Sequence, residues 1–243
     1  MEKYAIESSM AKVYCSELNG KVIDSGLQMM GGYGFIEEYT MARQYRDCRI
    51  DRIWEGTNEI NRQIITGYMM KKALMEELPI QGAIREIEQY MKNGELEAES
   101  EILLAESNVV ETSKRLALYL LNEGICEFGQ DLKHQQQIAD ILANIFMDIY
   151  VAESTVLRAK KMLGNPTSHP SVEGVAKIFV AEMAQQMVQL AETALKGIYN
   201  GDLSPLMHEN LNAFRSRLYL PTNTIGLKRE IAAYAYSKKC YPY

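Results

Sequence analysis

The stretch "IWEGTNEINRQIITGYMM", residues 53–70, indicates the fold class because it combines a helix-breaking glycine with a helical repeat of apolar residues. Apolar residues follow one helix face at steps of four, one and four: Ile60, Ile64, Ile65 and Met69. Gly56 would end a preceding helix, and Thr57 is a credible N-cap for the next one. The stretch therefore predicts a junction between two helices near Gly56.

The same helical periodicity continues through most of the chain. Near the start, apolar residues recur at steps of four: Ile6, Met10, Tyr14 and Leu18. Alternating, strand-like runs bounded by paired turn signals are missing from the sequence. We therefore expect an all-α fold of antiparallel helical bundles. Beyond residue 80 the expected helices cover residues 83–93, 97–122, 130–163, 171–200 and 224–237.

A seam at "EELPIQG", residues 76–82, divides the chain into two parts. Pro79 and Gly82 break the helical pattern there. Residues 1–75 contain ten basic and ten acidic side chains, so the remainder, with 16 and 22, carries the whole net charge of −6. We predict a first domain over residues 1–78 and a second helical bundle over residues 79–243.

Composition and charge exclude several classes of function. The acidic net charge offers no basic field for a phosphate backbone, which argues against a nucleic-acid partner. The four cysteines form no CxxC pair and the three histidines are scattered, so the usual zinc spacings are absent and no metal site is expected. Reduced thiols suggest a cytosolic type of compartment. No run approaches the 18 or so apolar residues that a membrane span needs.

The glycine cluster "GLQMMGGYGF", residues 26–35, has two interpretations. Glycines allow left-handed backbone angles and close approach, so exposed N–H groups could meet phosphate or ribose oxygens of a ligand. Alternatively, the cluster ends a helix and makes a turn. Spacing alone favours the turn, because no strand precedes the glycines as a dinucleotide-binding motif requires.

A basic ridge follows in "ARQYRDCRIDRI", residues 42–53. Arginines recur every third residue, at Arg43, Arg46, Arg49 and Arg52, with Asp47 and Asp51 interleaved. Carboxylates one helical turn away offset this charge. The spacing favours a solvated, salt-bridged face over an anion site.

Glu55 at the junction also has two interpretations. A carboxylate between two helices is usually a cap or a partner for the helix dipole. Beside the indole of Trp54 and shielded from water, however, a carboxylate is harder to ionise and can act as a general base near neutral pH. The residue pattern alone leaves both possibilities open.

Two longer stretches carry a family resemblance. "EKYAIESSMAKVYCSE", residues 2–17, and "LQMMGGYGFIEEYTMARQYRDCRIDRIWEGTNEINRQIITG", residues 27–67, closely resemble the C-terminal helical domain of acyl-CoA dehydrogenases. Three motifs recur in register: the Gln-x-x-Gly-Gly turn, the Tyr-Arg-Asp helix and the Glu-Gly-Thr-x-Glu junction. The resemblance covers residues 2–75 and implies part of that family's C-terminal four-helix domain.

The resemblance also assigns roles to individual residues. Glu55 would be the catalytic base that removes the α-proton of an acyl-CoA thioester, and its backbone N–H would polarise the thioester carbonyl. Gly56 would leave room for the substrate. Contacts to FAD would come from the residues that follow the junction, Thr57, Asn58 and Glu59, and from the glycine turn, Gln28, Met29, Met30, Gly31 and Gly32. In the family this turn contacts a flavin held mainly by a neighbouring subunit, which implies a homo-oligomer.

The family's N-terminal helical domain, its central β-domain and two further helices have no counterpart in this sequence. We therefore expect a C-terminal fragment that is inactive on its own and that exposes apolar faces, including that of Ile60, Ile64 and Met69. Residues 80–243 look like the additional helical domain of longer, very-long-chain-like members. Their acidic balance makes a membrane role doubtful.

The function implied for the parent protein is FAD-dependent α,β-dehydrogenation of acyl-CoA in fatty-acid β-oxidation, with electrons passing to an electron-transfer flavoprotein. The expected location is the cytoplasm of a bacterium, or the mitochondrial matrix if the source is eukaryotic. The alternative is a non-catalytic helical module that serves interaction or assembly.

Overall fold

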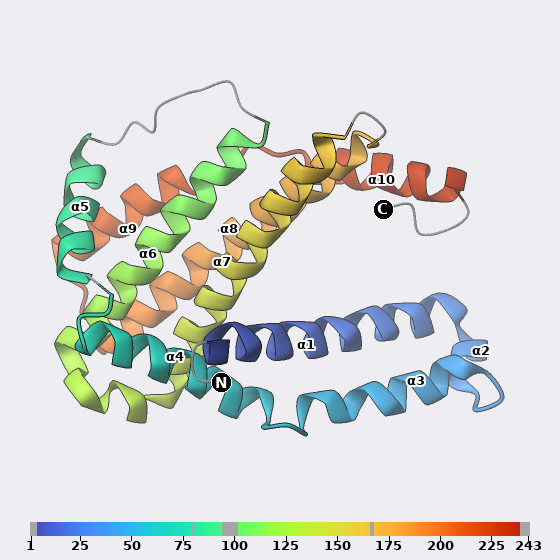
Figure 1. Ribbon diagram of the computed structural model, residues 1–243, viewed down its shortest axis with the longest axis horizontal. Coiled ribbons are helices and arrows are strands. Elements are labelled where there is room, and N and C mark those ends of the chain that lie inside the picture. The colour runs from blue at the N-terminus through green and yellow to red at the C-terminus, as the bar shows by residue number, and fades with distance from the viewer. Residues whose placement is uncertain (1–3, 79, 94–101, 166–167, 239–243) are drawn as a thin grey trace.

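The computed structural model describes residues 4–78, 80–93, 102–165 and 168–238, and every regular element in these ranges is a helix (Figure 1). This confirms the predicted all-α fold. The first part contains α1 (Ala5–Met30), α2 (Gly32–Phe35), α3 (Thr40–Cys48), the 3-10 helix η2 (Arg49–Arg52) and α4 (Asn58–Leu74). The second contains α5 (Ile80–Asn93), α6 (Leu104–Phe128), the 3-10 helix η3 (Gly129–His134), α7 (Gln136–Leu163), α8 (Ser171–Ile198), α9 (Pro205–Arg217) and α10 (Thr224–Lys238).

An extended arm is formed by α1, α2, α3 and η2, residues 5–52. Figure 1 shows α1 and α3 running side by side in opposite directions, with α2 at their far end. Gly31 ends α1 with a φ of +58°, a left-handed angle that suits glycine. A Cβ on Gly34 would lie 2.6 Å from the Leu27 carbonyl oxygen, so this turn also needs a glycine there. The glycine cluster therefore forms the predicted turn.

The bundle, residues 104–217, consists of α6, α7, α8 and α9. Figure 1 shows α6, α7 and α8 packed lengthwise, each antiparallel to the next, and the short connections make this arrangement possible. Its centre contains fully buried aliphatic side chains from all three helices, including Leu120, Leu142 and Met187. Helix α10 packs against the N-terminal part of α8, near Gly174 and Glu182, and extends beyond it.

Helix α4 joins the arm to the bundle because it packs against α1 on one side and α7 on the other. The buried apolar residues form one continuous cluster that runs from Ile6 through Ile65 to Leu218. Helix α4 ends at Leu74, shortly before the seam expected at residues 76–82, and α5 begins inside the seam at Ile80; Pro79 itself lies outside the described residues. The division into domains 1–78 and 79–243 stays a prediction.

The predicted apolar face of α4 is rotated relative to the buried one. The residues buried in α4 are Asn58, Asn61, Ile65, Thr66 and Met70. Ile60 is 54% exposed, while Ile64 and Met69 are only half-buried. Leu18 in α1 is likewise 43% exposed. Exposure of this face was expected, and it is found at Ile60 and only in part at Ile64 and Met69, while asparagine and threonine side chains that hydrogen-bond to neighbouring helices take the interior positions.

Two predicted helix limits were wrong, and one helix was missed. Helix α6 continues to Phe128 instead of ending near residue 122, and Gly124 therefore lies inside the helix. A glycine at this position allows Leu132 of η3 to pack closely, because an added Cβ would lie 3.1 Å from the Leu132 side chain. Residues 97–101 of the expected helix lie outside the described residues, and α6 begins at Leu104. The region expected to be helical from residue 130 starts as η3, and α7 begins only at Gln136.

Helix α9 was not predicted. Its start is nevertheless marked in the sequence, because the Ser204 hydroxyl accepts a hydrogen bond from the Met207 N–H at 3.2 Å and Pro205 occupies the first helical position. Phe214 of α9 is 1% exposed and lies beside Tyr119 of α6, with ring centroids 5.9 Å apart. Across the described ranges, no helix has the length and apolar character needed to cross a membrane.

Candidate functional site

The junction, residues 53–57, presents Glu55 on an unusual backbone. Glu55 has a φ of +52° and Gly56 a φ of +79°, so two consecutive residues adopt left-handed angles. Glycine takes this conformation at little cost, whereas a residue with a Cβ is strained by about 1 kcal/mol. Glu55 is exposed, and within the described part of the chain its backbone N–H has no hydrogen-bond acceptor. Strained backbone of this kind is enriched at functional sites.

Helix α4 starts directly after the junction, as predicted. The Thr57 hydroxyl accepts a hydrogen bond from the Ile60 N–H at 3.3 Å, which makes Thr57 the N-cap. Asn58 and Glu59 follow in the first turn. The sequence interpretation of this stretch as a helix junction with a capping threonine is confirmed.

Two side chains hold the Gly56 carbonyl oxygen from beneath. Lys12 of α1 donates to it from Nζ at 2.8 Å, and Asn61 of α4 donates from Nδ2 at 2.8 Å. Asn61 also donates to the Thr57 carbonyl oxygen at 3.1 Å. These contacts fix the Gly56–Thr57 peptide group to both helices. Sequence reasoning did not single out Lys12 or Asn61.

Asn58 lies under the junction and is 1% exposed. Its Oδ1 accepts from Lys12 Nζ at 2.7 Å, and its Nδ2 donates to Ser16 Oγ at 3.0 Å and to Glu17 Oε1 at 3.2 Å. Both ends of this amide are therefore engaged within the chain. A signal for this inward position existed, since Asn58, Asn61 and Ile65 follow each other at helical steps of three and four.

Glu59, by contrast, is exposed beside the N-cap. Its own backbone N–H and then the Thr57 hydroxyl hydrogen-bond its carboxyl group and hold the pKa of Glu59 below its usual range, with smaller contributions from Arg62 and Lys12. Thr57, Asn58 and Glu59 line one pocket of about 320 Å³ together with Glu17 and Lys21 of α1 and Arg49, Arg52 and Ile53. The structure thus brings this predicted group together.

The glycine turn lies far from the junction. At about 1.5 Å of rise per residue, Gln28 is about 18 Å along α1 from Ser16, which contacts Asn58. Gln28 to Gly32 are exposed, Met29 by 82%, and a Cβ on Gly31 or Gly32 would meet nothing within 4 Å. The two groups of predicted FAD contacts therefore form separate surfaces on this chain, at the base and at the tip of the arm (Figure 1).

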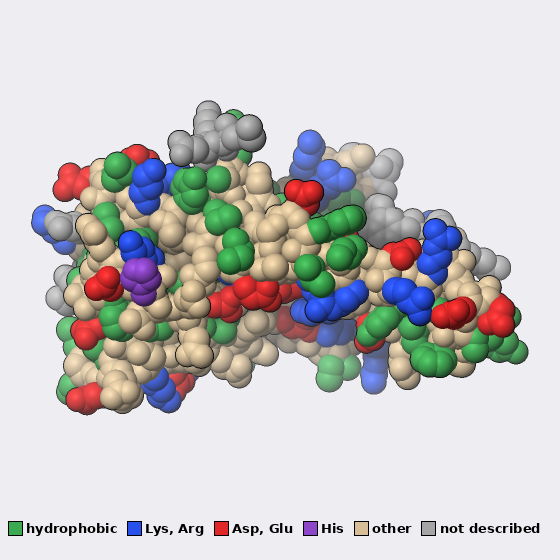
Figure 2. All heavy atoms as spheres, turned by 90° about the horizontal axis from the view of Figure 1, so that it is seen from below, with side chains coloured by type: hydrophobic (Ala, Val, Ile, Leu, Met, Phe, Trp, Pro, Cys, Tyr) green, Lys and Arg blue, Asp and Glu red, His purple; other side chains and the backbone are tan. Residues whose placement is uncertain are grey.

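The arginine ridge on α3 and η2 faces solvent at its first two positions. Arg43 pairs with Asp47 at 3.5 Å and Arg46 with Glu37 at 3.2 Å, all through strongly exposed side chains. Figure 2 shows acidic and basic side chains interleaved with hydrophobic ones over the arm. These contacts agree with the predicted salt-bridged face and add little to stability.

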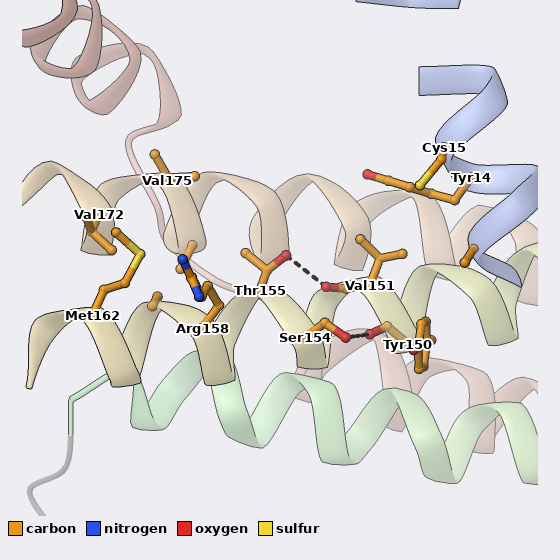
Figure 3. Close-up of a pocket in the computed structure, with 13 residues that line it drawn as sticks. Tyr14, Cys15, Tyr150, Val151, Ser154, Thr155, Arg158, Met162, Val172 and Val175 are labelled. Carbon is orange, nitrogen blue, oxygen red and sulfur yellow. Dashed lines mark hydrogen bonds between the residues drawn. The ribbon is translucent and has the colours of Figure 1, made fainter. Parts of the chain in front are cut away.

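A different pocket lies between α1, α7 and α8 (Figure 3). It has a volume of about 660 Å³, and its lining is largely apolar, with Tyr14, Met162 and Val172 among the residues. The hydroxyls of Ser154 and Thr155 donate to carbonyl oxygens one turn earlier in α7, each at 2.8 Å. None of the predicted site residues lines this pocket, so the candidate site remains the junction.

Comparisons with known families point to one group of enzymes. The sequence model of the family described as "Acyl-CoA dehydrogenase, C-terminal domain" matches residues 1–70, and a second model with the same description matches residues 112–212. A probable acyl-CoA dehydrogenase of Bacillus subtilis (strain 168) is 36% identical over an alignment of 243 positions, which covers 98% of this chain and 40% of the relative.

Further matches agree with this similarity. The subunit CarC of the caffeyl-CoA reductase-Etf complex of Acetobacterium woodii is 46% identical over 66 residues, which cover 27% of this chain and 17% of that protein. Among solved structures, an acyl-CoA dehydrogenase complexed with FAD from Bacillus anthracis is 31% identical, with a TM-score of 0.88. That match covers 98% of this chain and 40% of the other. The chain thus spans about two fifths of these two Bacillus relatives.

Proposed function

The chain belongs to the acyl-CoA dehydrogenase family, and from this premise we propose that it forms the C-terminal part of an enzyme that oxidises acyl-CoA thioesters to enoyl-CoA. Glu55 is the proposed base. The observation that carries this proposal is the exposed, left-handed Glu55–Gly56 junction, held from beneath by Lys12 and Asn61.

Glu55 would take the proton from the α-carbon of the acyl group, while the β-hydrogen leaves with its electron pair and a double bond forms between the two carbons. An α-C–H bond beside a thioester is only weakly acidic, so the carbonyl oxygen must be stabilised as it gains charge. The backbone N–H of Glu55 has no acceptor within the described residues and is available for that oxygen. The absence of a side chain on Gly56 leaves space for the substrate next to it.

FAD is the proposed cofactor, and bound FAD would accept the β-hydride. The half-buried Thr57 and the exposed Glu59 are available to it at the base of the arm, and the open turn from Gln28 to Gly32 is available at the tip. For Asn58 we propose an indirect contribution, because its buried amide is already bonded to Lys12, Ser16 and Glu17. The separation of the two surfaces supports a shared site, in which the tip of one subunit's arm reaches the flavin of another in a homo-oligomer.

The wider context is also proposed. The enzyme would serve fatty-acid β-oxidation and pass its electrons to an electron-transfer flavoprotein, in line with the Etf complex to which one relative belongs. The bacterial origin of the two Bacillus relatives supports a bacterial cytoplasmic location. For the 243-residue chain alone we propose no catalysis, since its junction is exposed and its two cofactor surfaces lie far apart. A role of this part of the chain in assembly is compatible with that view.

The proposal is tested by the substitution Glu55→Gln in a full-length enzyme, in which this chain is joined to the segment that its longer relatives have in addition. We expect acyl-CoA to reduce the bound flavin at least about a thousandfold more slowly, because glutamine cannot accept the α-proton. Stopped-flow bleaching of the flavin measures this rate, and equal FAD content in both proteins is the control. The chain alone, incubated with FAD and desalted, is expected to stay colourless. Unchanged flavin reduction in the variant would remove Glu55 from the mechanism.

A further inference from the structure

A continuous path of polar contacts connects α7 of the bundle to the junction. Arg62 of α4 is at its centre, with a side chain only 11% exposed. Its Nη2 donates to Glu17 Oε1 at 2.7 Å, and its Nε donates to Asn144 Oδ1 of α7 at 2.7 Å. The same Glu17 oxygen accepts from Asn58 Nδ2 at 3.2 Å. Three helices are thus joined through one guanidinium group.

The end of this path in α7 is fixed as well. Asn144 donates from Nδ2 to Asp140 Oδ2 at 3.3 Å, and Asp140 Oδ1 lies 3.5 Å from Arg62 Nε. A nearly buried guanidinium is stable only when its donors are paired, so these contacts hold Arg62 in one rotamer. At the other end, Asn58 shares Lys12 with the Gly56 carbonyl oxygen.

Resting on the proposed function of Glu55, we propose that Asn144 is a positioning residue for the junction. Asn144 sets the orientation of Arg62, Arg62 sets that of Glu17, and Glu17 with Lys12 orients Asn58 and the Gly56–Thr57 peptide, one residue beyond Glu55. By this path the bundle controls the geometry of the proposed base, although no bundle residue lines the junction pocket.

A second contact between α4 and α7 provides a matched control. The Thr66 hydroxyl donates to the Ala139 carbonyl oxygen at 2.6 Å, and Thr66 is 1% exposed. Thr66→Val removes this buried hydrogen bond but leaves Arg62, Glu17 and Asn58 untouched. Asn144→Asp keeps an oxygen acceptor for the guanidinium, although it loses the donor to Asp140, whereas Asn144→Ala loses both. The three variants therefore separate the polar path from helix packing in general.

The experiment uses the full 243-residue chain and two local readouts. Trp54, the only tryptophan, lies next to Glu55 and reports on the junction through its fluorescence. Amide hydrogen exchange of Ile60 and Asn61, whose N–H groups bond to the Thr57 hydroxyl and carbonyl oxygens, reports on the start of α4. In Asn144→Ala we expect a shifted Trp54 emission and about tenfold faster exchange of these amides, the effect of losing about 1.4 kcal/mol of local stabilisation. Asn144→Asp should change both readouts less than Asn144→Ala, because it keeps the acceptor for Arg62, and Thr66→Val should stay within about twofold of the exchange rates of the unmutated chain.

The proposal is overturned if Asn144→Ala lowers the melting temperature like Thr66→Val but leaves Trp54 emission and exchange unchanged, or if both variants change them alike. Asn144→Ser, which is also too short to reach Arg62, replaces the alanine variant should that fail to fold. Because neither readout requires flavin or substrate, the result is independent of the Glu55→Gln kinetics. Failure of the base assignment and failure of the positioning path would thus be seen separately.

Discussion

The arm and the bundle bury their hydrophobic side chains to very different extents. The bundle encloses large aliphatic residues completely, with Leu116, Leu120, Leu142, Met187 and Leu195 each at 0% exposure. In α1, by contrast, the buried positions end at Gly20, and the outer arm exposes Val22, Met29, Tyr33 and Phe35 by 60% or more. One chain therefore contains a region held by apolar burial and a region whose apolar surface is largely uncovered.

This difference shows that different interactions fix the structure of the bundle and of the arm. The bundle gains free energy from area removed from water, whereas the base of the arm is fixed by hydrogen bonds that Lys12, Asn58 and Arg62 make to neighbouring helices. An exposed apolar surface of this kind is typical of a face that another protein surface covers. Stability and site geometry should therefore respond to different mutations.

The largest expected effect comes from cutting the bundle core. Leu142→Ala should lower the free energy of unfolding by about 3 kcal/mol, because it removes buried methyl groups and leaves a cavity at a 0% exposed position. Phe35→Ala at the arm tip, where the ring is 77% exposed, should change it by less than about 0.5 kcal/mol. Urea unfolding followed by circular dichroism measures both values.

The unmutated 243-residue chain, unfolded under the same conditions and at the same protein concentration, is the reference for these two variants. If Phe35→Ala cost as much as Leu142→Ala, the ring would be buried in solution and the contrast between arm and bundle would be lost. A concentration-dependent midpoint would point to burial against another copy of the chain.

The second prediction concerns Asp148 of α7, at the boundary between the two regions. Burial is the main cause that raises its pKa to about 6, and Glu17 raises it further, while Lys21 and Arg62 lower it. Its Oδ2 is buried, and among the described residues it has no hydrogen-bond partner. The charged carboxylate therefore destabilises the folded chain above this pKa.

The direction of the pH dependence of stability follows from proton linkage. Since the folded pKa lies above the ordinary aspartate value, the folded state binds the extra proton, and the penalty shrinks as the pH falls below about 6 and is lost near the ordinary aspartate pKa. Asp148→Asn should thus raise the free energy of unfolding by about 1–2 kcal/mol near pH 8 and by almost nothing near pH 4. Urea titrations at both pH values measure it. A gain of equal size at both would mean that the carboxylate charge is not the cause.

The sequence predicted what depends on local pattern. The helical class, the turn at Gly31 and the capped start of α4 all follow from residue type and spacing. The buried face of α4 could not be predicted in this way, because the burial of Ile60 and Asn61 depends on which helices lie beside them. Helix α9 was missed although its Ser204–Pro205 start is legible, since Phe214 gains its importance only by contact with α6.

The candidate site was predictable to a similar degree. The motif around Glu55 predicts a site at the junction, and the family comparisons agree with the resemblance on which that prediction rests. The φ angles of single residues could not be read from the sequence. Neither could the contacts of Lys12 and Arg62, because these contacts join residues more than 40 positions apart. The individual site assignments remain predictions that mutation must test.

The smallest expected effect compares two strained glutamates on opposite ends of α4. Glu55 has a φ of +52° before the helix, and Glu76 has a φ of +59° after it. Replacing either by glycine relieves the clash of Cβ with the backbone and should raise the free energy of unfolding by about 0.5–1 kcal/mol after the entropic cost of glycine. Differential scanning calorimetry of the two variants measures this gain. In a longer enzyme with bound flavin, only Glu55→Gly should abolish acyl-CoA oxidation. If Glu76→Gly is stabilised and Glu55→Gly is not, the strain at Glu55 is relaxed in solution, and the junction is more mobile than its contacts with Lys12 and Asn61 imply.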